Sequence, residues 1–383
     1  MTVAHARLPF VDLEAQRRRL GGRIEAAIAA VLAHGQFIMG PEVARLEQAL
    51  AEQTGARDVI SCASGTDALL LVLMARGLGP GDAVFVPAFT FAASAEAVAL
   101  RGAIPVFVDV DPDSCNLDPG SLEDAILATR RAGLLTPRAV IAVDLFGRPA
   151  DYQPLRALVR AHGLFLLQDA AQSFGARWRG EPAGRQGDAA ATSFYPAKPL
   201  GAYGDGGAVL TDDPALAAEV RLLRLHGEQP ERMRYQHLRV GLNSRLDTLQ
   251  AAILLVKLEV LEEELERRAT IAARYDAAFG RLALRPPDLP DGRSAFAQYT
   301  IRVPARDRLR TALARQGIPT AIYYPVPLHH QPAYHHFPSA PRGLPVAEAL
   351  AARVLSLPIH PDLAEDDQAR IIDAILRSEQ KGA

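Results

Sequence analysis

Seven short runs rich in apolar and β-branched residues recur along the first half of the chain. They cover residues 58–64, 83–91, 105–111, 139–147, 164–171, 189–196 and 207–213. Most are separated by segments with apolar residues at helical spacing, such as "GTDALLLVLMARG" and "YQPLRALVRAHG". Continuous apolar runs that alternate with amphipathic helices are typical of an α/β domain with a largely parallel, buried sheet. The pattern therefore predicts one large seven-stranded sheet.

The segments on either side of this sheet follow other patterns. Residues 22–56 predict helices. After Asn243, "RLDTLQAAILLVKLEVLEEELERRATIAARYDAAF" predicts a long connecting helix, whose charged run "EEELERR" is expected to face solvent. A Pro-rich segment at 286–290 then opens a smaller α+β unit, with "FAQYTIRV" as a strand and "RDRLRTALARQG" as a helix. We expect a large domain with N-terminal helices over residues 1–250, and a connecting helix with a small C-terminal domain over residues 251–383.

Composition excludes several classes of protein. The 383 residues are 49% hydrophobic and carry a net charge of -2 without a block of like charges, so neither a nucleic acid nor a membrane surface is an expected partner. The N-terminus lacks the pattern of a signal peptide or membrane anchor. The two cysteines, Cys62 and Cys115, are too few for a disulfide framework and lack metal-ligand spacing. We expect a cytoplasmic protein without a metal site.

Lysine is scarce in this chain. Of the 42 basic residues only Lys198, Lys257 and Lys381 are lysines. A lysine amine can lose its proton and act as a nucleophile or base, whereas an arginine stays protonated. Lys257, in a charged helical stretch, and Lys381, in the C-terminal tail, fit ordinary surface lysines. Lys198, in "SFYPAKPLGAYGDGG" between two predicted strands, is either a solvated loop residue or a reactive amine.

Polar and aromatic residues follow several predicted strands, at the edge where open α/β sheets bind ligands. The Ser-Gly-Thr turn at 64–66 opens a helix and is either a phosphate site or a simple N-cap. Asp169 follows "LFLLQ" and is expected to be buried, so it needs a partner, either a ligand or a structural salt bridge. Phe89 or Phe91 offers a stacking face or belongs to the core.

Pyridoxal 5'-phosphate (PLP) matches these strand ends better than other cofactors. Its phosphate needs a helix N-terminus, its ring a stacking face, its ring nitrogen an anion and its aldehyde an amine. A dinucleotide-binding oxidoreductase is disfavoured because "GAYGDGG" precedes a strand instead of following one, and no P-loop motif is present. A non-catalytic binding protein on the same fold stays open, although the lysine counts against it.

The chain also resembles the DegT/StrS-type nucleotide-sugar aminotransferases, which have the type I PLP fold of aspartate aminotransferase. The motifs occur in order over nearly the whole chain. They are "HGQFIMGPEVARLE", "SGTDAL", "PAFTFAASAEAV", "PVFVDVDPDSCNLDP", "QDAAQSFG", "SFYPAKPLGAYGDGGA", "RLHG", "GLNSRLDTLQAAIL" and "YYPVPLHHQPAY". Several consecutive motifs in the right order are far more specific than any one of them.

This resemblance implies a role for each matching residue. Lys198 binds the cofactor covalently and Asp169 faces its ring nitrogen, so these two are the catalytic candidates. The other cofactor-binding candidates are Gln172 near the ring hydroxyl, Gly65, Thr66 and Ser193 at the phosphate, Phe91 stacked on the ring, and Asn243, which reaches the phosphate of the adjacent subunit. A homodimer with shared active sites is therefore expected.

The resemblance also suggests a substrate. Related enzymes that remove a sugar hydroxyl have histidine in place of the lysine, so Lys198 favours transamination over a PLP-dependent sugar dehydratase. The chain is most similar to aminotransferases that act on UDP-linked 2-acetamido-3-oxo-glucuronic acid in pathways to bacterial O-antigens, and we expect L-glutamate as the amino donor. A 4-keto-6-deoxy nucleotide-sugar aminotransferase is the alternative within the class.

Four residues are candidates for substrate binding. Arg245 is expected to bind a carboxylate of both substrates, or else to cap the following helix or pair with an acidic residue. Tyr323 and Tyr324 stand where many relatives have His-Tyr, so a contact expected from that histidine is changed. His329, in the same motif, is the fourth candidate.

Overall fold

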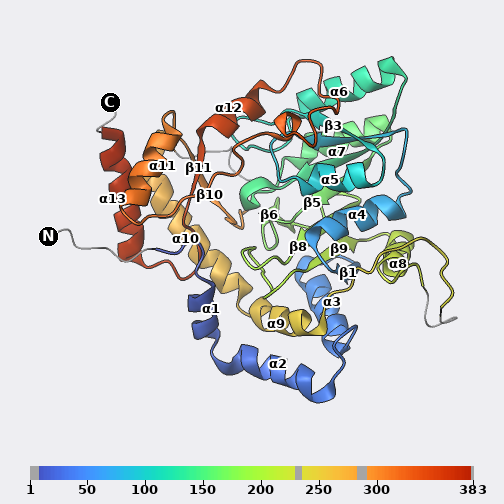
Figure 1. The fold of residues 1–383 in the computed structure, drawn as a ribbon, viewed down its shortest axis with the longest axis horizontal. Coiled ribbons are helices and arrows are strands. Elements are labelled where there is room, and N and C mark those ends of the chain that lie inside the picture. Colours follow the sequence, from blue (N-terminus) through green and yellow to red (C-terminus); the bar gives the residue numbers. More distant parts are fainter. Residues whose placement is uncertain (1–7, 229–234, 283–290, 381–383) are drawn as a thin grey trace.

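The computed structural model describes residues 8–228, 235–282 and 291–380, and its central element is one seven-stranded sheet (Figure 1). The strands lie in the order β1 (Asp58–Cys62), β9 (Gly207–Thr211), β8 (Ala189–Ser193), β5 (Phe165–Asp169), β4 (Thr136–Val143), β2 (Asp82–Pro87) and β3 (Ile104–Val108). All neighbouring strands are parallel except β9, which is antiparallel to both β1 and β8. The predicted seven-stranded, mostly parallel sheet is confirmed.

Helices precede the sheet and connect most of its strands. They are α1 (Leu13–Leu20), α2 (Gly22–His34) and α3 (Pro41–Thr54) before the sheet, then α4 (Gly65–Ala75), α5 (Ala93–Leu100), α6 (Pro119–Ala132), α7 (Tyr152–His162) and α8 (Pro214–Leu223). The side chains of Ser64, Asp118, Asp151 and Asp213 accept hydrogen bonds from first-turn N–H groups of α4, α6, α7 and α8. Such caps fix the residue at which each helix begins.

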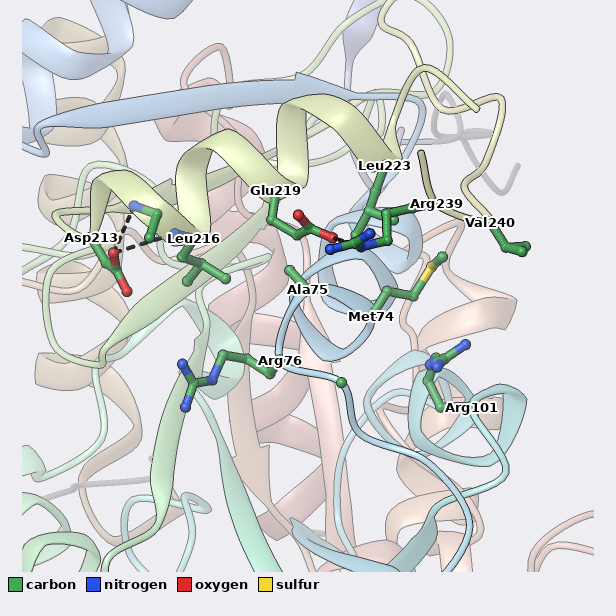
Figure 2. Close-up of a pocket in the computed structure, with 12 residues that line it drawn as sticks. Met74, Ala75, Arg76, Arg101, Asp213, Leu216, Glu219, Leu223, Arg239 and Val240 are labelled. Carbon is green, nitrogen blue, oxygen red and sulfur yellow. Dashed lines mark hydrogen bonds and ion pairs between the residues drawn. The ribbon is translucent and has the colours of Figure 1, made fainter. Parts of the chain in front are cut away.

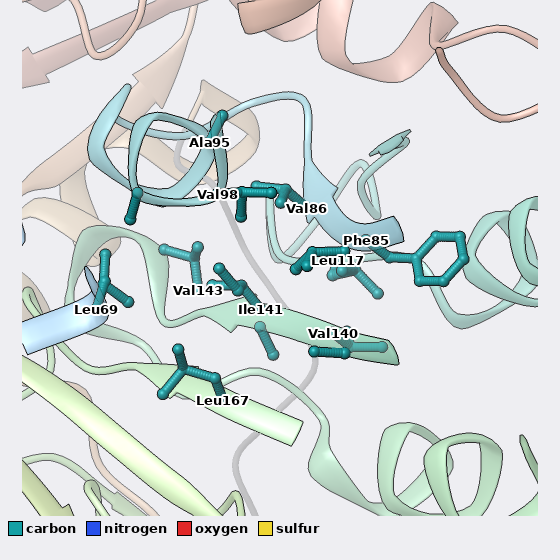
Figure 3. Packing of buried hydrophobic residues seen from close by; sticks show 14 of the residues in the cluster. Leu69, Phe85, Val86, Ala95, Val98, Leu117, Val140, Ile141, Val143 and Leu167 are labelled. Carbon is teal, nitrogen blue, oxygen red and sulfur yellow. The ribbon is translucent and has the colours of Figure 1, made fainter. Parts of the chain in front are cut away.

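The sheet is buried on both faces. Ala208 and Leu210 of β9 pack into a core cluster with residues of α3, whereas Val209 between them packs into a second cluster with residues of α4. Alternate residues of a strand point to opposite faces, so these clusters lie on opposite sides of the sheet. Figure 3 shows the second cluster, in which Leu69 of α4 and Val98 of α5 lie close to side chains of β2, β4 and β5.

The predicted connecting helix is in fact two helices. These are α9 (Thr248–Leu258) and α10 (Leu261–Phe279), and Val260 between them leaves helical geometry with φ -109° and ψ 1°. Figure 1 shows them as two separate coils. One continuous helix was therefore the wrong expectation. The reason is that α9 packs against α2 and α3, whereas the second half of α10 packs into the core of the C-terminal part.

One expectation about surface charge is wrong and another holds only in part, because most charged residues of the run in α10 are exposed as expected. Lys257 is only 2% exposed, and its Nζ donates to the carbonyl oxygen of Gly201 at 2.7 Å and lies over the ring of Tyr203. Within the charged run of α10, Glu264 and Arg268 are buried, and Arg268 donates to two main-chain carbonyls of the C-terminal part. Charged side chains at these positions hold neighbouring segments together instead of facing solvent.

The C-terminal part contains the expected strand and helix. The antiparallel strands β10 (Tyr299–Arg302) and β11 (Val354–Leu357) enclose a third core cluster with α10, α11 (Arg306–Arg315) and α13 (Glu365–Gln380). In contrast, the 3-10 helix η3 (Leu328–His330) and α12 (Pro345–Arg353) contribute to the core cluster of α4 and the sheet. The Pro-rich segment 286–290 and Lys381 lie outside the described residues, and a division of domains at residue 250 stays a prediction.

Neither cysteine is paired. Cys62 and Cys115 are buried free thiols, and burial raises the pKa of each, that of Cys115 to about 12. A buried protonated thiol packs as a small apolar group and is unreactive. Among the described residues, no helix combines the length and the apolar character needed to cross a membrane.

Candidate active site

A cavity of about 500 Å³ opens at the carboxyl ends of β1, β2, β5 and β8. It is lined by nine of the predicted site residues, namely Gly65, Thr66, Phe91, Asp169, Gln172, Ser193, Lys198, Tyr323 and Tyr324. These residues come from distant parts of the sequence and are brought together because parallel strands end at the same edge of the sheet. This cavity is the candidate active site.

Lys198 lies on the loop between β8 and β9. Its backbone N–H donates to the carbonyl oxygen of Tyr195 at 2.8 Å, which forms a tight turn just after the end of β8. The side chain is partly buried, and burial lowers the pKa of the Lys198 amine, although the charge of Asp169 opposes that effect. A lowered pKa favours the neutral amine, which is the nucleophilic form.

Asp169, the last residue of β5, is a buried carboxylate. It is 6% exposed, and it accepts hydrogen bonds from Ser94 Oγ at 2.8 Å and from the backbone N–H of Ala171 at 3.2 Å. Burial raises the pKa of this carboxyl, and the hydrogen bond from Ser94 opposes the rise. No described residue forms an ion pair with Asp169 within 4 Å, so a salt bridge to another side chain does not account for its burial.

The N-terminus of α4 forms a cradle beside Ser193. The first N–H groups of a helix have no intrahelical acceptor, and here Ser64 caps only that of Asp67. A Cβ atom at Gly65 would lie 2.7 Å from the Cβ of Ser193, so only glycine leaves this space open. The Ser-Gly-Thr turn is therefore an N-cap that still presents free N–H groups, as an anion site requires.

Aromatic and amide side chains form the opposite wall of the cavity. Phe89 belongs to the core, whereas Phe91 is 57% exposed and lies 6.2 Å from the ring of Tyr324. Gln172 donates from Nε2 to the hydroxyl of Tyr324 at 3.4 Å. Burial raises the pKa of Tyr324, so its hydroxyl stays protonated at neutral pH. Tyr323 also lines the cavity.

Asn243 and Arg245 lie in a second cavity of about 620 Å³. Its lining shares Ser64 and Asp205 with the first cavity, so the two are adjacent. No described residue forms an ion pair with Arg245, and the side chain of Asp247 makes no capping hydrogen bond to α9. The two structural roles considered for Arg245, capping and ion pairing, are therefore not observed.

His329 lies outside both cavities. Its Nε2 is 3.1 Å from Glu348 Oε1, and it belongs to η3, which is fixed to the sheet by the hydrogen bond from Leu328 N–H to the carbonyl oxygen of Ala88.

A third cavity, of about 630 Å³, lies between α8 and the C-terminal end of α4 (Figure 2). Arginines and the Glu219–Arg239 ion pair line it, but no predicted site residue does.

Sequence analysis missed several residues of the candidate active site. Those that line the cavity or contact its carboxylate are Ser94, Thr90, Tyr195, Asp205 and Gln298. Ser94 and Thr90 lie within the motif "AFTFAAS", and Tyr195 and Asp205 lie within the motif "SFYPAKPLGAYGDGGA" that contains Lys198. Proximity to these motifs was the available signal, whereas Gln298 lies in an ordinary strand segment with no such sign.

The cavity fits each functional group of PLP. A protonated ring nitrogen would give Asp169 the cationic partner that it lacks among the described residues, and the cradle at Gly65 has the N–H groups that a phosphate needs. Phe91 leaves an aromatic face exposed, and Lys198 supplies an amine. On a mostly parallel sheet of this topology, such a site defines a PLP-dependent enzyme with the type I fold.

Comparisons with known proteins agree. The sequence profile of the DegT/DnrJ/EryC1/StrS aminotransferase family matches residues 19–376, and the chain belongs to this family. It is 48% identical over 359 residues to the UDP-2-acetamido-2-deoxy-3-oxo-D-glucuronate aminotransferase of Pseudomonas aeruginosa, a match that covers 93% of this chain and 96% of the relative.

Solved structures match as well. A DegT/DnrJ/EryC1/StrS aminotransferase from Brucella abortus has a TM-score of 0.94 and 52% identity, over 97% of this chain and 99% of the other. NtdA from Bacillus subtilis, solved with the bound cofactor PMP, has a TM-score of 0.88 and 28% identity, over 99% of this chain and 86% of the other. The protein is a PLP-dependent aminotransferase of the sugar-modifying type.

Proposed function

We propose that the enzyme moves an amino group from L-glutamate to C3 of UDP-2-acetamido-2-deoxy-3-oxo-glucuronic acid. The observation that carries this substrate is the 48% identity, over nearly the full length of both chains, to the Pseudomonas aeruginosa aminotransferase named for it. We further propose that the enzyme works as a cytoplasmic homodimer whose subunits share active sites.

The chain's residues divide the work of binding the cofactor. The N–H groups of Gly65 and Thr66 at the start of α4, with the hydroxyl of Ser193, bind the phosphate. Phe91, with its ring exposed, would offer a stacking face to the cofactor ring. When bound, PLP supplies an aldehyde that takes up the amino group and a ring that delocalises the electron pair left by a departing proton.

Lys198 and Asp169 act on the bound substrate in different ways. Burial lowers the pKa of the Lys198 amine, so its Nζ can accept the proton that leaves the substrate's carbon. The same Nζ then donates this proton to the carbon on the other side of the transferred nitrogen. Asp169 holds a negative charge against the ring nitrogen and so keeps that nitrogen protonated. Ser94 keeps the Asp169 carboxylate in place through its 2.8 Å hydrogen bond.

A second subunit completes the site in this proposal. The second cavity contains Ile38, and the consecutive residues Phe37, Ile38 and Met39 are all exposed large apolar side chains. Such a patch on a globular protein favours contact with another surface. Covered by a second copy, the cavity would bring Asn243 and Arg245 of one chain to the cofactor site of the other.

Arg245 gives the proposal a test of substrate chemistry. A guanidinium without an ion partner is suited to bind a carboxylate, and both the uronic acid and glutamate carry one. Both half-reactions should be measured by absorbance for wild type, Arg245→Ala and the control Arg239→Ala, which removes an arginine of the third cavity. With Arg245→Ala we expect a loss of about 2 kcal/mol, roughly thirtyfold, in both half-reactions.

The same panel should include the matching keto-hexose without a carboxylate and a 4-keto-6-deoxy nucleotide sugar. Wild type should strongly prefer the 3-oxo-uronate, and Arg245→Ala should lose most of that preference. Equal preference in both proteins would place carboxylate recognition elsewhere, with Tyr323 and Tyr324 next to test. Preference of the wild type for the 4-keto sugar would refute the proposed substrate.

Subunit complementation tests the shared site. Inactive Lys198→Ala chains mixed with inactive Asn243→Ala chains should regain part of the activity, because one site of each hybrid dimer has both intact residues. Subunit exchange without any recovery of activity would show that each site is built within one chain.

A further inference from the structure

Two histidines and a glutamate converge on the surface beside α12, away from the cofactor cavity. His329 and His330 are consecutive residues of η3, and Glu348 is on α12. Nε2 of His329 is 3.1 Å from Glu348 Oε1, and Nε2 of His330 is 3.5 Å from the same oxygen. One ligand atom from each of the three residues lies within 4.8 Å of the others. We call these three residues the His-His-Glu cluster.

These separations match those between ligands of a single small metal ion. Bonds from Zn²⁺ to imidazole nitrogen or carboxylate oxygen are about 2.0–2.1 Å, so two ligand atoms of a tetrahedral site are about 3.3 Å apart. The separations of the two histidine nitrogens from the Glu348 oxygen, 3.1 and 3.5 Å, lie on either side of that value. We propose that His329, His330 and Glu348 bind one Zn²⁺ ion, with water as the fourth ligand.

The cluster is held in place by the fold. Leu328, next to His329, is buried and its N–H donates to the carbonyl oxygen of Ala88 just after β2. The first turn of α12 is fixed by Asp109, just after β3, whose carboxylate accepts from the N–H groups of Val346 and Ala347 at 3.0 and 2.9 Å. Because both segments are anchored to neighbouring strands, the ligands need little rearrangement to bind an ion.

The charges of the cluster also suit a cation. An imidazole offers a nitrogen lone pair, and the Glu348 carboxylate offers an anionic oxygen, so each residue of the cluster has a suitable ligand atom. Two imidazoles and one carboxylate are a ligand set that zinc uses in proteins. His330 and Glu348 are exposed, which gives an ion a path from solvent.

Zinc at this position would link η3 to α12. The segment that ends in η3 carries Tyr323 and Tyr324 of the active-site cavity, so the ion would fix the outer end of that wall. The cofactor and Lys198 are not ligands, so the ion has no part in the transfer of the amino group. Sequence analysis assigned no metal site because the third ligand comes from a helix further along the chain.

Zinc binding to the tag-free holoenzyme tests the inference. The protein should be stripped with a chelator, freed of excess cofactor and titrated with Zn²⁺ against a chromophoric chelator. We expect one tight equivalent per chain, and a weakening of tenfold or more in both His330→Leu and Glu348→Gln. His336→Leu is the matched control, since His336 is an exposed histidine of the same segment outside the cluster, and it should bind like the wild type.

Equal affinity in all four proteins, or equal loss in His336→Leu, would overturn the inference, as would the absence of a stoichiometric site in the wild type. A second measurement does not depend on the variants. Crystals of the wild type grown with Zn²⁺ should show an anomalous peak at the zinc edge between the three ligands. A peak elsewhere only, or none, would refute the site even if a variant failed to fold.

Discussion

The hydrogen bond from Ser94 to Asp169 can be removed with little change of volume. Ser94 is 1% exposed, and its Oγ donates to Asp169 Oδ2 at 2.8 Å. Replacement by alanine deletes one oxygen and leaves the carboxylate with a single hydrogen bond, from the backbone N–H of Ala171. Ser94→Ala should therefore weaken the ionised form of Asp169, which keeps the ring nitrogen of PLP protonated.

The size of the effect follows from burial. A hydrogen bond to a charged group contributes about 1.5–3 kcal/mol, and both partners here are almost fully removed from solvent. Each 1.4 kcal/mol corresponds to a factor of about ten in rate. If the loss falls on proton removal from the substrate, Ser94→Ala should slow the glutamate half-reaction by roughly tenfold to a hundredfold. Glutamate affinity should change little, because Ser94 does not line the cavity.

Stopped-flow absorbance after mixing the holoenzyme with glutamate measures this rate. Ser173→Ala is the matched control, because Ser173 is also fully buried and donates to a different buried carboxylate, Asp144 Oδ2, at 2.6 Å. Ser173→Ala should lose about as much free energy of unfolding as Ser94→Ala, but its half-reaction rate should stay within about twofold of the wild type. A Ser94→Ala rate equal to that of the wild type, or an equal slowing in Ser173→Ala, would refute the reasoning.

Three further predictions concern other parts of the site. Lys198→Arg should replace the amine by a permanent positive charge and abolish turnover, and borohydride should then fix no cofactor on the peptide with residue 198, because a guanidinium does not form the bond; in the wild type, labelling at Lys257 instead of Lys198 would contradict the assignment. Gly65→Ala should weaken cofactor binding at least tenfold in equilibrium dialysis, because its Cβ would lie 2.7 Å from that of Ser193, and unchanged binding would argue against the cradle. Burial raises the pKa of Asp144 from 3.8 to about 6, so its native state holds a proton that the unfolded chain releases, and its contribution to stability falls by about 3 kcal/mol as pH rises from about 4 to 6. Urea unfolding should therefore show the stability gap between wild type and Asp144→Asn shrinking from pH 4 to pH 7, and a constant or widening gap would contradict this.

The sheet was predictable because its strands are buried on both faces. Runs such as "LFLLQ" are apolar without alternation, and few other environments tolerate them. The break between α9 and α10 was not predictable from local sequence, since "KLEVLE" contains neither glycine nor proline and tertiary packing decides it. Burial of Lys257 had a signal that was overlooked. Lys257 follows Ile253 and Leu254 by four and three residues, which places it on the apolar face of α9.

The active-site residues that could be predicted from the sequence are those that lie at the ends of strands. Asp169 follows the apolar residues of one strand, and Lys198 lies between two apolar strands. A charged residue is unusual at either position. Ser94 could not be singled out, because a serine at the start of a helix is common and only the fold brings it to Asp169. The second cavity with Arg245 and the meeting of His330 with Glu348 depend on tertiary contacts that no local pattern encodes.

The pairing of β1 with β9 determines how much of the chain must be synthesised before the cofactor site can form. Among the described strands, β1 pairs only with β9 and lies at the edge of the sheet, so Cys62 meets its partner Gly207 only after the first half of the chain has been made. Until then the turn at Ser64 and Gly65 lacks the strand that joins β1 to β8, the strand that ends at Ser193. A chain that ends before residue 207 contains Lys198 and Asp169 but lacks this joining strand, so we expect it to bind the cofactor only weakly. We therefore expect tight cofactor binding only once β9 has been synthesised and has paired with β1 and β8.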